Sequence, residues 1–205
     1  STVSGATVST LNAGDNLTGG AGSDTLTLSN TSATAAHGAG VTTSGIESLS
    51  VNAVTATTVD ASLMSGITGV TNNGSLSAVS VTGLTAIPEV TVLASSANTT
   101  VGMTAATTVG TADAMTINLN GASATAGSTV TAAGIETFNV NASGSASGAL
   151  TRPVTLTSAN AQTVTITGDA ASAIAANLAG ATATAQGTVT GNDAANTVLL
   201  TANGT

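Results

Sequence analysis

Residues 41–53 read VTTSGIESLSVNA, and residues 130–142 read VTAAGIETFNVNA. The two segments share eight of thirteen positions, including GIE and VNA, at an offset of 89 residues. The same offset places Asp24 on Asp113. An internal repeat is the sequence signature of proteins built by stacking similar units. We therefore predict pseudo-repeats over about residues 11–99 and 100–188, followed by a partial segment at 189–205.

Short runs of alternating apolar and polar residues recur along the chain, such as LTL from Leu26, LSV from Leu49 and VTI from Val164. Alternation predicts strands with one buried and one solvated face. The larger intervals between runs are about 23–25 residues, the coil length of a solenoid. The expected fold is therefore all-β, a single elongated domain over residues 1–205 that forms a parallel β-solenoid of the β-helix or β-roll type. A sandwich of antiparallel strands is the alternative, because short alternating runs do not fix strand direction.

Composition agrees with a narrow interior. Hydrophobic residues make up 41% of the 205 residues, yet the chain has one Phe and no Trp, Tyr or Cys. Small side chains cannot fill the wide core of a compact globule, whereas a stack of coils needs little bulk. Phe138 aligns with Leu49 at the repeat offset, which predicts a core position. Asn52 and Asn141 each follow an alternating run, which predicts turn residues.

The net charge of the chain limits the classes of molecule that it can bind. The formal net charge is −8, and the chain has no Lys and a single Arg, Arg152, which we interpret as a surface charge. Such a chain cannot neutralise phosphates, so nucleic acid and anionic membranes are poor partners, and we expect neither nucleic-acid binding nor membrane insertion. The sequence contains no apolar run long enough for a membrane span and no signal peptide. Multivalent cations are the natural counter-charge.

A candidate cation site lies in Thr18–Leu28, which reads TGGAGSDTLTL. Calcium-binding nonapeptides follow the pattern G-G-x-G-x-D-x-U-x, where U is a large apolar residue. Calcium takes six to eight oxygen ligands, including backbone carbonyls, and glycines allow the turn conformations that present them. The sequence therefore predicts Ca²⁺ ligation at Gly20, Gly22 and Asp24.

Other acidic positions extend or qualify this site. Asp15 lies nine residues before Asp24 in a degenerate copy of the motif, and the pair forms the predicted calcium site. Asp193 is a weaker candidate ligand near the C-terminus. Asp113 lacks the glycines, so we expect a turn with weak or no ion binding. Glu47 and Glu136, in the repeated GIE, are interpreted as bonding to a neighbouring turn, with cation ligation as the alternative.

The segments GGAGSDTLTL, GIESLSVNA and GIETFNVNA, in a Ser/Thr/Ala/Gly-rich chain without Cys, resemble the repeat-in-toxin (RTX) type surface-layer proteins of Gram-negative bacteria and related large extracellular proteins. The resemblance implies calcium binding, type I secretion and assembly into lattices or filaments at the bacterial cell surface. It rests on one complete nonapeptide rather than a tandem block.

The sequence therefore predicts a structural, self-assembling extracellular protein that forms a calcium-dependent surface layer or filament. Its expected partner is itself, and a cell-surface polysaccharide is a further candidate. The alternative is a solenoid stalk or binding segment of a large RTX adhesin.

Two other classes are less well supported. An enzyme would need a cluster of acid–base groups, whereas His37 stands alone in AAHGAG and is expected to be an exposed loop residue. The chain is therefore expected not to be an enzyme. Outward T-x-T rows such as Thr25/Thr27 suggest ice or mineral binding. That function needs a flat array on every coil, and the irregular spacing of the runs argues against one.

Overall fold

The computed structural model describes residues 11–33, 36–120, 128–143, 153–160, 163–168, 172–178 and 196–201. Its secondary structure in these ranges is all β, and none of these residues forms a helix that could cross a membrane. Eight strands form one sheet: β3 (Ala36–His37), β6 (Thr57–Asp60), β8 (Val79–Leu84), β10 (Thr99–Met103), β12 (Ser128–Ala132), β14 (Pro153–Ser158), β16 (Ser172–Leu178) and β17 (Asn196–Thr201).

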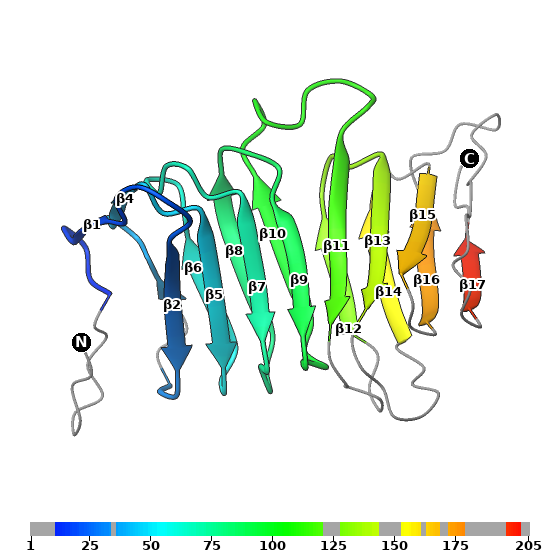
Figure 1. Ribbon diagram of the computed structural model, residues 1–205, viewed down its shortest axis with the longest axis horizontal. Helices are drawn as coiled ribbons and strands as arrows, with labels where there is room; N and C mark the ends of the chain where they lie inside the picture. Colours follow the sequence, from blue (N-terminus) through cyan, green and yellow to red (C-terminus); the bar gives the residue numbers. More distant parts are fainter. Residues whose placement is uncertain are drawn as a thin grey trace.

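A second sheet faces the first across a narrow core (Figure 1). Its seven strands are β2 (Thr25–Asn30), β5 (Ser48–Ala53), β7 (Gly69–Asn73), β9 (Glu89–Leu93), β11 (Ala114–Asn120), β13 (Thr137–Ser143) and β15 (Thr163–Gly168). A small third sheet pairs β1 (Asn16–Thr18) with β4 (Thr42–Ser44). Every strand pairing is parallel, which confirms the β-solenoid and excludes the antiparallel sandwich.

The chain alternates between the two large sheets, so that through most of the stack each coil contributes one strand to each. Coil length varies widely: Gly69 lies opposite Glu89 in a short coil, whereas Thr99 lies opposite Val130 in a much longer one. The links between strands absorb this variation, above all residues 104–113, which form the long loop at the top of Figure 1. The narrow range of coil spacing expected from the sequence is therefore wrong.

The 89-residue repeat corresponds to four coils, because β11 lies four strands from β2 in the seven-stranded sheet. The two copies do not superpose along the sheet, however. The row of inward side chains that contains Leu26 passes through Val90 to Ile117, not to the aligned residue Met115. The second copy is therefore displaced by two residues along its strands, about 7 Å.

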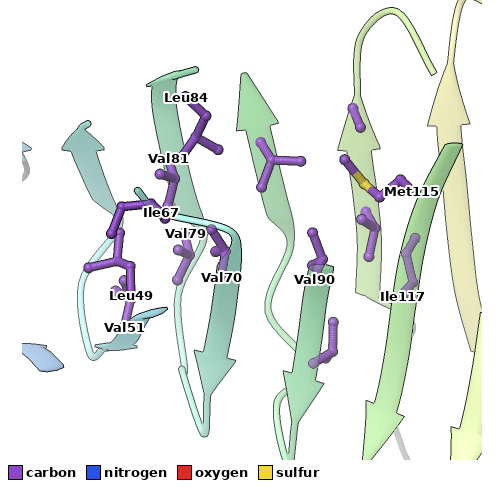
Figure 2. Packing of buried hydrophobic residues seen from close by; sticks show 14 of the residues in the cluster. Leu49, Val51, Ile67, Val70, Val79, Val81, Leu84, Val90, Met115 and Ile117 are labelled. Carbon is purple, nitrogen blue, oxygen red and sulfur yellow. The ribbon is translucent and has the colours of Figure 1, made fainter. Parts of the chain in front are cut away.

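Rows of aliphatic side chains fill the space between the sheets (Figure 2). Leu49 and Val70 lie in register on neighbouring strands and are 0% and 1% exposed. Phe138 is 0% exposed, in register with Met115 and Val164, which confirms its predicted core position. Burial of each such side chain contributes about 1.5–3 kcal/mol, so small residues suffice when every coil adds several.

His37 is not an exposed loop residue. It lies in β3 opposite Val59, in the inward row that continues to Val81, and is 7% exposed. A two-residue strand is too short to show alternation, so the sequence did not reveal it. The turn prediction for Asn52 and Asn141 is also wrong, because both lie within strands of the seven-stranded sheet.

Outward-facing polar side chains form continuous rows across the coils. One row on the seven-stranded sheet runs Thr27, Ser50, Thr71, Thr91, Asn118, Asn141, Thr167. The irregular spacing of the runs therefore does not disturb the array, because loops take up the extra residues and parallel pairing keeps the strands in register. The rows mix hydroxyl and amide side chains rather than repeating threonine.

Candidate cation site

The links that lead from the eight-stranded to the seven-stranded sheet lie along one edge of the solenoid, at the top of Figure 1. The Asp and Glu residues of the described ranges all lie in these links, beside them, or at the strand ends they join; we call this edge the acidic edge. Its carboxylates are Asp15, Asp24, Glu47, Asp60, Glu89, Asp113 and Glu136.

The opposite edge carries the return links and is rich in amide side chains, and we call it the amide edge. At this edge Asn30 Nδ2 donates to Thr57 Oγ1 on the next coil at 2.8 Å. Asn72, which is 0% exposed, donates in the same way to Thr99 Oγ1 at 2.9 Å. Side-chain amides thus tie successive coils together where the chain turns back.

The glycines before Asp24 serve two different purposes. Gly20 and Gly22 have φ of 112° and 121°, a region that side-chain-bearing residues rarely adopt, and a Cβ on either would meet nothing within 4 Å. At Gly19, by contrast, a Cβ would collide with the Gly45 carbonyl oxygen and would lie 2.8 Å from Asp24 Cγ. Glycine is required at residue 19 because two coils approach closely there.

The GIE segment holds the Asp24 turn from the next coil. Glu47 Oε2 accepts a hydrogen bond from the Asp24 backbone N–H at 2.9 Å. In return, the Asp24 carbonyl oxygen accepts from the N–H groups of Glu47 and Ser48, each at 3.1 Å. The interpretation of Glu47 as a bond to a neighbouring turn is therefore confirmed.

The second repeat builds the same arrangement without the glycine-rich turn. Glu136 Oε2 accepts from the Asp113 N–H at 2.8 Å, and the Asp113 carbonyl oxygen accepts from the N–H groups of Glu136 and Thr137, each at 3.0 Å. Gly134, the counterpart of Gly45, packs against Thr108, where a Cβ would lie 2.6 Å from Thr108 Oγ1. The turn expected at Asp113 is thus held by Glu136.

Both aspartates have a carboxylate oxygen that lacks a donor. Asp24 Oδ2 and Asp113 Oδ2 are buried and have no hydrogen-bond partner among the described residues. Each belongs to the residue whose own N–H binds a glutamate carboxylate, so each turn holds two acidic side chains. A buried charged group without a partner is costly, and a cation that prefers oxygen ligands would remove that cost.

Two other carboxylates of the acidic edge are satisfied differently. Asp60 Oδ1 accepts from the Ser62 N–H at 2.9 Å; this bond, followed by one from the Ser62 hydroxyl, holds the pKa of Asp60 below its ordinary value of 3.8. Glu89 Oε1 accepts from Asn118 Nδ2 at 2.6 Å. These two groups already have donors and make weaker candidates for a cation.

Asp15 has local contacts of its own. Asp15 Oδ2 accepts from the Asn12 N–H at 2.8 Å, and its carbonyl oxygen accepts from the Thr42 N–H at 2.9 Å. Asp24 instead contacts Glu47. The joint calcium site of Asp15 and Asp24 stays a prediction, as do the roles of Gly20 and Gly22. Asp193 and Arg152 lie outside the described residues.

Within the described ranges no three Asp, Glu, His or Cys side chains gather as metal ligands. A cation at either Asp–Glu pair would therefore complete its coordination with carbonyl oxygens and water. The Gly45 carbonyl oxygen would be one such donor in the first repeat, because it flanks Gly19 together with the Asp24 side chain. The separation of Asp24 and Glu47 in the sequence equals the coil from β2 to β5, but coil length varies along the chain, so the sequence alone did not identify this pairing.

Comparison of the chain with protein-family models gave no match, and searches of the curated proteins and of the solved structures gave no significant match.

Proposed function

We propose that this chain is a structural, extracellular protein that self-assembles through its solenoid ends into a calcium-dependent surface layer or filament. The observation that supports this most directly is the open parallel stack. Within the described ranges, β2 has a single neighbour in its sheet, β5, and β15 has a single neighbour, β13. A strand edge with free N–H and C=O groups is a template for pairing with another chain.

The two ends of a parallel solenoid are different surfaces. Contact between them is heterologous, and such contacts produce open filaments or lattices when the rotation does not close a ring. Small, uncharged outward side chains leave few steric or electrostatic barriers to stacking. The acidic edge supplies the calcium dependence, because carboxylates on stacked copies repel until cations neutralise them.

Location at a bacterial cell surface after type I secretion belongs to the same proposal and rests on the resemblance to RTX-type proteins. The absence of a catalytic role is likewise proposed, from the position of His37. This side chain lies in the core row at 7% exposure, where a substrate has little access to it.

Negative-stain electron microscopy of the purified chain tests the proposal, first in chelator and then with millimolar calcium. We expect ordered filaments or sheets to form with calcium and to dissolve on chelation. Filaments or sheets that form with or without calcium would support self-assembly and contradict its calcium dependence. Dispersed monomers in both conditions would contradict self-assembly.

A second candidate is the stalk of a large adhesin. The continuous outward rows of Ser, Thr and Asn favour it, because hydroxyl and amide groups in register can hydrogen-bond a polysaccharide chain. Monomers that sediment with an insoluble cell-surface polysaccharide, but never form ordered assemblies, would support this candidate.

A further inference from the structure

We propose that Asp113 and Glu136 form a second divalent-cation site, four coils from the corresponding pair of Asp24 and Glu47. The ligand class is an oxygen-preferring divalent cation, with calcium as the probe. The inference goes beyond the proposed function, since it holds for a dispersed monomer and does not depend on self-assembly. It also revises the expectation of weak or no ion binding at Asp113, which lacks the glycine-rich turn.

The first argument is burial. Glu136 is 4% exposed, and Asp113 Oδ2 is buried without a donor in the described part of the chain. A buried carboxylate oxygen without a donor needs a positive partner, because burial removes the water that would otherwise solvate it. Within the described ranges no Lys or Arg is present to supply it, and the whole chain holds one Arg and no Lys.

The second argument is the internal comparison of the two repeats. The glycine-rich turn is present in one copy and absent from the other, yet both copies keep the Asp N–H bound by Glu Oε2, at 2.9 Å and 2.8 Å. Both also leave the same atom, Oδ2 of the aspartate, buried and without a donor in the described ranges. The two repeats therefore share the Asp–Glu pair, whereas the glycines are needed only for the backbone conformation of the turn in the first repeat.

The third argument is the contrast with the other carboxylates on the same edge. Asp60 and Glu89 each accept a side-chain or backbone hydrogen bond, from Ser62 and Asn118. Neither has a buried oxygen without a donor in the described residues. Diffuse attraction of cations to the acidic edge would involve all of these groups alike, whereas specific sites would involve only the two Asp–Glu pairs.

Calcium binding by the full-length chain, measured by equilibrium dialysis at a concentration where light scattering shows monomers, tests the proposal. The variants are Asp113→Asn and Glu136→Gln, which remove charge; the amide introduced by Glu136→Gln keeps an oxygen that can accept from the Asp113 N–H. Each variant is expected to bind one calcium ion fewer than the parent chain. The remaining sites should keep their affinity within about threefold, because groups far apart act independently.

Three control variants test whether the loss of calcium is specific to Asp113. Asp60→Asn removes one charge from the same edge and should leave the number of bound ions unchanged. Asp24→Asn should remove one ion, and the double variant Asp24→Asn/Asp113→Asn two. If Asp113→Asn binds as many ions as the parent chain, or if Asp60→Asn loses as much calcium as Asp113→Asn, the proposed site is overturned.

Thermal unfolding distinguishes a binding site from a purely structural contact. In chelator, Asp113→Asn should unfold at the same or a higher temperature than the parent chain, because it relieves carboxylate repulsion. In saturating calcium it should unfold at a lower temperature, because it lacks one bound ion. A variant that is less stable by the same amount in both conditions would show that Asp113 only maintains the turn, and would overturn the proposal.

The result is separable from the test of assembly. Sites that bind calcium on a chain that never polymerises would contradict the proposed function and leave this inference intact. Polymers that form although Asp113 binds no calcium would contradict this inference and leave the proposed function intact.

Discussion

Ala94 stands out among the residues of the turns because it adopts a left-handed conformation with φ of 48°, which costs a residue with a Cβ roughly 1–2 kcal/mol. Gly74 holds the corresponding position one coil earlier, directly after β7, with φ of 59°. Their N–H groups donate to the next coil in the same way, to Asn120 O and Leu93 O. The same turn is thus built once with glycine and once with alanine.

This difference predicts opposite effects of reciprocal substitutions. Ala94→Gly should raise the free energy of unfolding by up to about 1 kcal/mol, since relief of strain exceeds the added entropy of the unfolded chain. Gly74→Ala should lower it by about 1–2 kcal/mol. Urea titrations followed by circular dichroism measure both. Equal signs for the two variants would contradict the account.

At the scale of the element, each strand is stabilised by rows of side chains that run across successive coils rather than by contacts along its own length. Phe138 in β13 lies between Met115 and Val164 and is fully buried. Its counterpart at the repeat offset is Leu49, which is also fully buried. The interior therefore accommodates leucine and phenylalanine at related positions.

The loss in free energy of unfolding on truncation of Phe138 should accordingly increase with the side-chain volume removed. Phe138→Ala should lower the free energy of unfolding by about 3–5 kcal/mol, because it leaves a cavity between two strands. Phe138→Leu should cost roughly 1–2 kcal/mol, since most of the apolar surface is kept. Denaturant midpoints of the two variants provide the measurement. Equal losses in free energy of unfolding would show that stability does not depend on the side-chain volume at residue 138.

The elements also show what the sequence could and could not predict. Strands such as β5 and β15 follow directly from period-two alternation, and the strong repeat predicted a solenoid. The register between coils could not be read from the sequence, because the coil from β7 to β9 is much shorter than the coil from β10 to β12. For the same reason the contact of Glu47 with Asp24 was foreseen only as a bond to some neighbouring turn, and the two-residue strand β3 that buries His37 was missed.

At the scale of the whole molecule, the end of the stack is the decisive surface for assembly. Thr27 lies on β2, which has one described neighbour, whereas Thr71 lies in the same outward row on the internal strand β7. Lysine on an edge strand opposes pairing with another chain. Thr27→Lys should therefore reduce the calcium-induced mass of polymer at least several-fold.

The matched variant Thr71→Lys adds the same charge to the same face, away from the end, and should leave the polymer mass nearly unchanged. Sedimentation of polymer from both variants provides the comparison. If Thr71→Lys impairs assembly as strongly as Thr27→Lys, copies associate through the sheet face, and the end-to-end arrangement is wrong.

The separation of the acidic edge from the amide edge has a consequence for how copies can lie beside one another in a plane. Two neighbours that bring their acidic edges together repel, whereas an acidic edge beside an amide edge does not. In a layer ordered in this way all acidic edges point in the same direction, so the layer is polar along that direction in its plane. Calcium, by bridging acidic edges, would permit the opposite packing, and ion concentration would then select between a layer of uniform orientation and one in which neighbours alternate.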